Sequence, residues 1–141
     1  MNEFLHSLRV YIEDTDAGGI VYYVNYLKYF ERCRTELFRS LGFGKAAILE
    51  EGRLLVVKKI DVDYLMPARL DDELVASARI EKIANTYVIF HQAIDRDGQC
   101  LCRGSVKIAC VSQVGKTIKP TALPKPVQTA LSVYQAKSLK G

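Results

Sequence analysis

Residues 24–41, VNYLKYFERCRTELFRSL, are the stretch that decides the fold of this 141-residue chain. Apolar side chains recur there at steps of four, three, four and four residues, at Tyr26, Phe30, Cys33, Leu37 and Leu41. This spacing predicts an amphipathic helix with one buried face, and Gly42 is a favourable residue to end it. No other stretch of the first 115 residues predicts a long helix.

Strand patterns lie on both sides of this helix. Before it, residues 5–13 alternate, with Leu8, Val10 and Ile12 on one face. After it, four stretches rich in β-branched and aromatic residues predict strands at 53–66, 73–83, 86–94 and 99–111. Gly98 marks the last hairpin turn, where a positive backbone angle is needed. One long helix on one mostly antiparallel, five-stranded sheet is an α+β architecture.

The alternation also predicts two details of packing. One face of the first strand after the helix collects the apolar residues Leu54, Val56, Ile60, Val62, Tyr64 and Met66. In the last strand, Cys102 and Gly104 are small residues on an apolar face. We expect the long helix to pack closely above them.

We expect one domain over residues 1–141, with a tail from about residue 115 that contains a possible helix at 126–136. A single helix covers only one face of a five-stranded sheet. The strand edges and the remaining apolar surface therefore predict a dimer or a larger assembly.

Composition narrows the class of protein. The net charge of +4 is dispersed, with no concentrated basic stripe, so nucleic-acid binding is not expected. No apolar run approaches the roughly 18 residues of a membrane span, and the N-terminus does not resemble a secretion signal. We therefore expect a soluble, cytoplasmic protein. Its four cysteines lack metal-site spacing and are interpreted as buried free thiols.

An acidic stretch with two glycines, EDTDAGGIVYY at residues 13–23, precedes the long helix. One interpretation is a turn and a helix cap. The other is an active site, in which Gly18 and Gly19 allow a ligand to approach the backbone and the helix start polarises a carbonyl oxygen. An aspartate there is a candidate nucleophile or general base. The residues alone leave both interpretations open.

The run from Tyr11 to Tyr22, with Glu13-Asp14-Thr15-Asp16-Ala17-Gly18-Gly19 inside it, resembles the signature of the hotdog-fold acyl-CoA thioesterases of the 4-hydroxybenzoyl-CoA type. The likeness is closer to the YbgC branch, which is associated with the Tol–Pal gene cluster. It continues through Asn25-Tyr26-Leu27, Phe30-Glu31-Arg32, Arg34-Thr35-Glu36, Val56-Val57-Lys58-Lys59, the stretch from Pro67 to Leu74, Lys119-Pro120 and Leu123-Pro124. Together these cover roughly residues 8–126.

The resemblance implies a hotdog fold, dimers with joined sheets that often pair into tetramers, and active sites shared between subunits. It places the catalytic carboxylate at Asp16, as nucleophile or general base, and the oxyanion donor at the backbone N–H of Tyr23. Asp14 is assigned to the turn. Many YbgC-type members have His where this chain has Tyr23, so an acid or base role for a histidine side chain at that position does not apply here.

The implied activity is hydrolysis of acyl-CoA, with no cofactor and no metal. We expect substrate contacts from Gly18, Gly19, Tyr22, Asn25, Lys58 and Lys59, with Arg69 and Lys82 as further candidates for the CoA phosphates. An alternative is a protein that mainly binds acyl carrier protein or a lipid-synthesis assembly, with hydrolysis secondary. A hotdog dehydratase is disfavoured, because the motif contains no candidate catalytic histidine.

Overall fold

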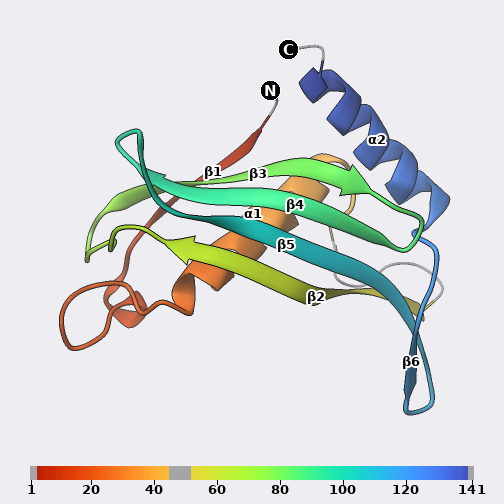
Figure 1. Ribbon diagram of the computed structural model, residues 1–141, viewed down its shortest axis with the longest axis horizontal. Helices are drawn as coiled ribbons and strands as arrows, with labels where there is room; N and C mark the ends of the chain where they lie inside the picture. The colour runs from red at the N-terminus through yellow and green to blue at the C-terminus, as the bar shows by residue number, and fades with distance from the viewer. Residues whose placement is uncertain (1–2, 45–51, 140–141) are drawn as a thin grey trace.

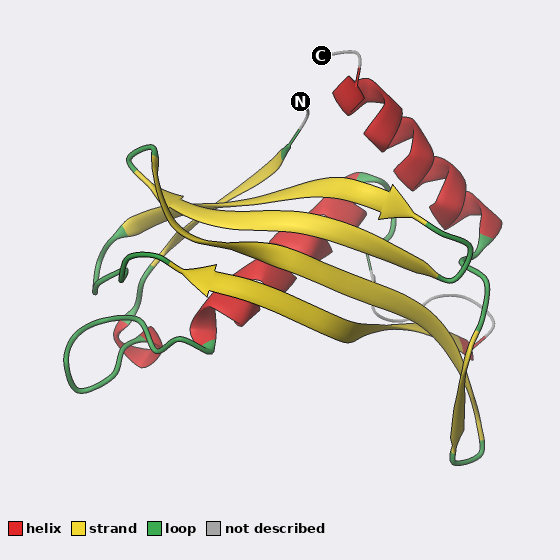
Figure 2. Cartoon of the chain, viewed as in Figure 1, coloured by secondary structure: helices red, strands yellow, loops and turns green. Residues whose placement is uncertain are grey.

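The computed structural model describes residues 3–44 and 52–139. Its elements are β1 (Phe4–Arg9), a 3-10 turn η1 (Ile12–Asp14), α1 (Asn25–Ser40), β2 (Arg53–Tyr64), β3 (Glu73–Ile83), β4 (Tyr87–Arg96), β5 (Gln99–Val114), β6 (Thr117–Pro120) and α2 (Lys125–Leu139). Figures 1 and 2 show α1 crossing one face of a curved sheet, with α2 beside the end of β3.

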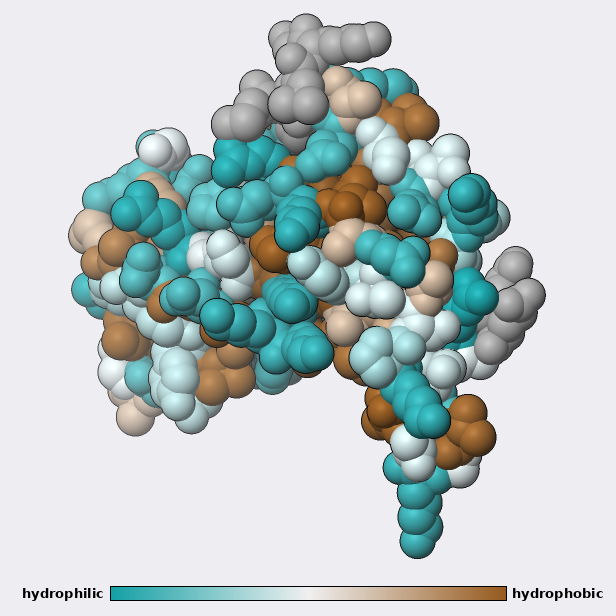
Figure 3. Space-filling model, turned by 45° about the vertical axis from the view of Figure 1, so that its right-hand side comes forward, coloured by the Kyte–Doolittle hydropathy of each residue, from teal (hydrophilic) through white to brown (hydrophobic). Residues whose placement is uncertain are grey.

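The five long strands are arranged in the order β1-β3-β4-β5-β2, and the short strand β6 pairs with β5. Every described pairing between these strands is antiparallel. The predicted α+β fold, one long helix on an antiparallel sheet, is confirmed. The strand β6 falls in the stretch that we expected to be a tail. It forms a hairpin that projects from the body and carries the exposed apolar residues Val114 and Ile118 (Figure 3).

The buried face of α1 is the one that the apolar spacing predicts. Tyr26, Phe30, Cys33 and Leu37 are buried, and Leu41 packs against the core. The tail helix is also confirmed, and it is longer than predicted. Leu123, Val127 and Leu131, in α2 and just before it, are buried in the same core as α1. In the described part of the chain, no helix is long and apolar enough to cross a membrane.

The first strand ends earlier than the alternation predicts. After Arg9 the chain enters η1, and Ile12 is 77% exposed instead of facing the core with Val10. The cause is local. The Tyr11 N–H donates to Asp14 Oδ2 at 2.9 Å, and the Asp14 N–H donates back to Tyr11 O at 2.9 Å. These reciprocal bonds curl the chain and rotate Ile12 outward.

The expected inward face of β2 is wrong in the first half of the strand. The pairing of β2 with β5 shifts between Val57 and Lys59, so one extra residue enters β2. An inserted residue reverses which side chains face inward. As a result Leu55 packs against the core, together with Ile60 and Val62 from beyond the shift, while Val56 is exposed.

The small residue Gly104 has close neighbours in the paired strand β2. A Cβ placed on Gly104 would lie 2.2 Å from the Asp61 carbonyl oxygen and 2.9 Å from Val62 Cγ2. Glycine is therefore required at this position for β2 and β5 to approach. Gly104 is also paired with Gln92 of β4, whose side chain donates to Phe30 O of α1, so the small residue lies on the face that the long helix covers.

All four cysteines are free thiols, and Cys33, Cys102 and Cys110 are buried. Burial raises the pKa of Cys33 and of Cys102 to about 12. A thiol with such a pKa is almost entirely protonated at neutral pH, and the thiol form is a poor nucleophile. The interpretation of these residues as core side chains is confirmed for the three buried ones.

Candidate active site

Asp14 connects the start of the loop after β1 to the start of α1. It is 5% exposed, and its Oδ1 accepts a hydrogen bond from Asn25 Nδ2 at 2.8 Å while its Oδ2 accepts the Tyr11 N–H. Its backbone carbonyl accepts the Tyr22 N–H at 2.9 Å. Because both carboxylate oxygens accept hydrogen bonds from within the chain, Asp14 stabilises the turn.

Tyr29 is buried in the interior, close enough to Asp14 to be affected by its charge. Burial raises the pKa of the Tyr29 hydroxyl, and the negative charge of Asp14 raises it further. Among the described residues, the hydroxyl has no hydrogen-bond partner of good geometry. Asp14 therefore acts on Tyr29 mainly through its charge, and Tyr29 remains neutral at physiological pH.

Asp16, two residues later, is exposed. Its Oδ1 accepts the Gly18 N–H at 2.8 Å, and no hydrogen bond to its Oδ2 is found within residues 3–44 and 52–139. A tight turn holds it, since the Asp16 N–H donates to Ile20 O and the Gly19 N–H donates to Asp16 O. Gly19 has a φ of +78°, which favours glycine. The turn thus presents one carboxylate oxygen to solvent.

The backbone N–H groups at the start of α1 follow this turn in the sequence and differ in whether they have an acceptor. The N–H groups of Asn25, Tyr26 and Leu27 donate to the carbonyls of Tyr22, Tyr23 and Val24. For the Tyr23 N–H itself, no acceptor lies in hydrogen-bonding position in the described part of the chain. Unpaired amides at a helix start carry partial positive charge and suit a developing oxyanion. Residues 16–23 are called the catalytic loop below.

A cavity of about 240 Å³ adjoins the catalytic loop. It is lined by Ile20, Val21, Tyr23, Tyr26, Tyr64, Leu65, Met66 and Pro67. The aromatic rings form one cluster, because the Tyr64 ring centroid lies 6.0 Å from that of Tyr23 and 5.5 Å from that of Tyr26. The cavity is therefore an apolar, aromatic space immediately beside the start of α1.

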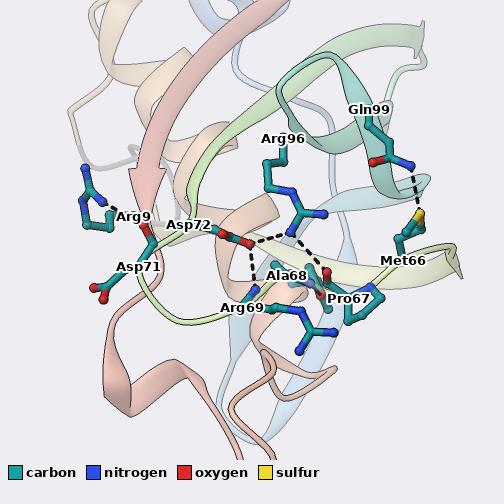
Figure 4. A network of polar contacts seen from close by, with 10 residues as sticks. Arg9, Met66, Pro67, Ala68, Arg69, Asp71, Asp72, Arg96 and Gln99 are labelled. Carbon is teal, nitrogen blue, oxygen red and sulfur yellow. Dashed lines mark hydrogen bonds and ion pairs between the residues drawn. The ribbon is translucent and has the colours of Figure 1, made fainter.

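A second loop, residues 67–72, packs against the catalytic loop and is called the support loop (Figure 4). The Val21 N–H donates to Ala68 O at 2.8 Å, and the Leu70 N–H donates to Gly19 O at 3.3 Å. In return, the Ala68 N–H donates to the Tyr26 hydroxyl at 2.9 Å. Three hydrogen bonds thus connect segments that are nearly 50 residues apart in the sequence.

The support loop is itself held by an ion pair. Arg96 Nη1 lies 2.6 Å from Asp72 Oδ2, and the same oxygen accepts the Arg69 N–H at 2.8 Å. Neither Asp72 nor Arg96 is among the site residues expected from the sequence. No local pattern marks them, because the pair joins a loop to the end of β4.

The structure brings five of the expected site residues together, and it separates the others from them. Gly18, Gly19, Tyr22 and Tyr23 lie with Asp16 in the catalytic loop. Asn25 is only 6% exposed and donates to Asp14, which favours a positioning role over the substrate contact expected from the sequence.

The two lysines expected to bind CoA lie elsewhere on the sheet. Lys58 and Lys59 are exposed on β2, and Lys59 precedes Tyr64 by five residues, which is about 16 Å along a strand. Lys82 lies over the ring of Tyr87, at 5.5 Å from its centroid. Within one chain, therefore, none of these three cations is part of the catalytic loop, whereas the exposed Arg69 is in the adjoining support loop.

Among residues 3–44 and 52–139, no group of three or more His, Cys, Asp or Glu side chains is placed to hold a metal ion. His6 lies on β1 and His91 on β4, each within a paired strand. The candidate chemistry is therefore that of one carboxylate, Asp16, with backbone amides.

Comparisons with known proteins agree with this geometry. The family model described as "Thioesterase superfamily" matches residues 18–102. The protein named "Acyl-CoA thioesterase YbgC" from Haemophilus influenzae is 44% identical over 130 residues, which cover 92% of this chain and 94% of the relative. The crystal structure of a probable thioesterase from Bartonella henselae matches with a TM-score of 0.75 and 32% identity, covering 86% of this chain and 98% of that one.

A further solved structure, the DHNA-CoA thioesterase from Staphylococcus aureus, has a TM-score of 0.88 and covers 100% of this chain and 96% of its own. Its identity of 23% restricts that likeness to the fold. The matched region of the family model includes the helix start, the aromatic cavity and the support loop.

Proposed function

Because the chain belongs to the thioesterase superfamily and has its hotdog fold, we propose that it hydrolyses acyl-CoA thioesters to a free acid and CoA. The observation that carries the proposal is the position of Asp16, an exposed carboxylate in the turn that leads directly into α1. The exposed carboxylate and the unpaired Tyr23 N–H, just before α1, lie within eight residues of each other in the sequence. That pair meets the two needs of thioester hydrolysis: a nucleophile or base, and an oxyanion site.

In this mechanism the thioester carbonyl oxygen accepts the Tyr23 N–H. Asp16 then attacks the carbonyl carbon, the C–S bond breaks, CoA leaves as a thiolate and a mixed anhydride remains, which water hydrolyses. In the alternative, Asp16 takes a proton from a water that attacks the same carbon, with the same C–S bond broken. A thiolate leaves readily, so neither route needs a strong general acid. The aromatic cavity is the proposed place of the acyl group.

The oxyanion role is tested at Tyr23 by separating its backbone from its side chain. Tyr23→Pro removes the N–H, and proline is tolerated near a helix start. We expect it to lower kcat by about 100- to 1000-fold. The matched control, Tyr23→Phe, keeps the N–H and should remain within about threefold of wild type. Steady-state release of CoA thiol measures both variants. A folded Tyr23→Pro protein with normal kcat would assign the oxyanion site elsewhere.

We also propose that two copies associate through β2, with pairing of such dimers into a tetramer as the further expectation. β2 ends the order of long strands, so its outer edge has no partner strand among the described residues. Beside it runs a mostly apolar groove of about 110 Å³ between α1 and β2, lined by Phe38, Leu55, Val57 and Ile108 together with Glu31, Arg34 and Thr35 of α1. An unpaired edge next to an apolar groove suits a second copy of the chain.

Light scattering on a sizing column tests this assembly. The wild type should have the mass of at least two 15.8 kDa chains. Val57→Asp, which places a charge in the groove, should shift the mass to a single chain, because an interface core excludes unpaired charge. Val133→Asp on α2, where the side chain is similarly exposed, is the control and should not change the mass. A wild type that is monomeric at all concentrations would refute the proposed dimer.

The proposed substrate is an acyl-CoA, and the proposed compartment is the cytoplasm. Four free thiols, three of them buried, are consistent with a reducing compartment. No feature of the described residues favours acyl carrier protein over CoA. Comparing turnover of one acyl group on CoA and on the carrier would separate the two substrates.

A further inference from the structure

We propose that Asp72 and Arg96 are positioning residues for the hydrolysis. Their ion pair fixes the support loop, to which the catalytic loop is hydrogen-bonded. The kinetic part of this proposal rests on the proposed function. Its structural part concerns the backbone of the catalytic loop and is measurable without any substrate.

The support loop determines where the middle of the catalytic loop lies. Val21 and Gly19 are both bonded to it through their backbones, at Ala68 and Leu70. These two residues stand between Asp16 and the Tyr23 N–H, so a shift of the support loop changes the distance between the carboxylate and the oxyanion donor.

The support loop also holds the other end of the catalytic segment. The Val10 N–H donates to Asp72 O at 3.0 Å, and the Asp71 N–H donates to Val10 O at 3.0 Å. Val10 is buried and directly precedes the turn that contains Asp14. Val10, where the chain enters the site, and residues 19–21 at its centre are thus both hydrogen-bonded to the support loop.

The support loop contains no helix or strand of its own, and side-chain contacts add to the backbone hydrogen bonds that hold it. The Asp72 carboxylate receives Arg69 N–H and Arg96 Nη1, and Arg96 Nη1 also lies 3.4 Å from Pro67 O (Figure 4). These contacts tie the first, third and last residues of the loop together. Asp71 has a φ of +70°, a left-handed conformation that is uncommon for non-glycine residues and that aspartate adopts more readily than most.

The charge state of the pair is stable at neutral pH. Burial alone would raise the pKa of Asp72, but the hydrogen bonds from the Arg69 amide and Arg96, together with the Arg96 charge, outweigh it and lower the pKa. Asp72 is therefore ionised at neutral pH. We expect the loop to stay folded when the pair is removed, because Arg9 Nη1 donates to Asp71 O at 2.7 Å and the Val10 bonds do not involve the pair.

The test replaces Arg96 in two ways. Arg96→Met removes the charge and the donors but keeps an unbranched side chain, while Arg96→Lys restores the charge. For Arg96→Met we expect kcat to fall about 10- to 100-fold with KM within about twofold, because displacements near 1 Å in a site have effects of this size. Arg96→Lys should recover kcat to within about threefold to fivefold of wild type. Asp72→Asn should resemble Arg96→Met.

The matched control is Arg39→Met, which removes a more exposed arginine whose Nε lies 3.0 Å from Glu36 Oε1 on α1. It should leave kcat unchanged. A second readout is amide hydrogen exchange in the intact protein. The Val21 N–H, which donates to Ala68 O, and the Leu70 N–H, which donates to Gly19 O, should exchange at least about tenfold faster in Arg96→Met than in wild type or Arg39→Met, since the support loop that makes these bonds is released.

The outcomes are separable. Normal kcat and normal exchange of the Val21 and Leu70 N–H groups in Arg96→Met would overturn the proposal, as would a fall in thermal stability alone with kcat unchanged. If the wild type hydrolyses no acyl-CoA, the proposed function fails. The exchange measurement then still decides whether the ion pair orders the catalytic loop.

Discussion

Replacing Asp16 by asparagine is expected to abolish nearly all acyl-CoA hydrolysis while the protein stays folded. Asparagine keeps the Oδ1 atom that accepts the Gly18 N–H at 2.8 Å, so the turn survives. It removes the charge that either attacks the carbonyl carbon or takes a proton from water. Loss of a general base or a nucleophile of this kind lowers kcat by about 100- to 10,000-fold.

Kinetic and unfolding measurements together test the role of Asp16. Steady-state kinetics on a panel of acyl-CoA thioesters gives kcat and KM, and circular dichroism with urea unfolding reports the fold. The control is Asp61→Asn. Asp61 is an exposed aspartate on β2, so this substitution removes the same charge at a position away from the catalytic loop. Its kcat should match wild type. An Asp16→Asn or Asp16→Ala enzyme within twofold of wild-type turnover would show that another group performs the chemistry.

The panel also addresses the acyl group. The cavity beside the start of α1 is apolar and is lined by the tyrosines at positions 23, 26 and 64. If the acyl chain enters it, KM should vary with the size and aromaticity of the acyl group much more than with changes on CoA far from the thioester. The Asp61→Asn enzyme should show the same variation of KM as wild type, because that side chain lies outside the cavity.

The parts of the fold that were predictable depend on contacts close in sequence. The buried face of α1 follows from its 3.6-residue period, and β3 has the predicted bounds because both its ends are marked by turns. The inward face of β2 was not predictable. A single extra residue near Val57 reverses the pattern, and nothing in the run of Val and Lys residues marks where the insertion falls.

The same distinction applies to the site. Asp16, Gly18, Gly19 and the Tyr23 amide lie within eight residues, so one quoted stretch contains them all. The division of work between Asp14 and Asp16 was suggested by family resemblance, and the geometry now supports it physically, since only Asp14 is buried with both carboxylate oxygens bonded. The support loop depends on long-range pairing, which a local pattern does not express.

Replacing Asp14 by alanine is expected to have the opposite profile from Asp16→Asn: a large loss of stability and a smaller loss of turnover. The change leaves Asn25 Nδ2 and the Tyr11 N–H without their acceptor at a site that is 5% exposed. Each unsatisfied buried donor costs about 1–3 kcal/mol. We therefore expect the free energy of unfolding to fall by about 2–4 kcal/mol.

Urea unfolding at constant temperature measures this loss, with turnover assayed under conditions where the variant is folded. Asp63→Ala, an exposed aspartate on β2, is the control and should change the free energy of unfolding by less than about 0.5 kcal/mol. A greater loss of turnover for Asp14→Ala than for Asp16→Ala, at unchanged stability, would exchange the two roles. The comparison is decisive because the two carboxylates are two residues apart and differ in burial and in their donors. Both residues are aspartates, so any difference in stability or turnover between their alanine variants is caused by their surroundings and not by the residue type.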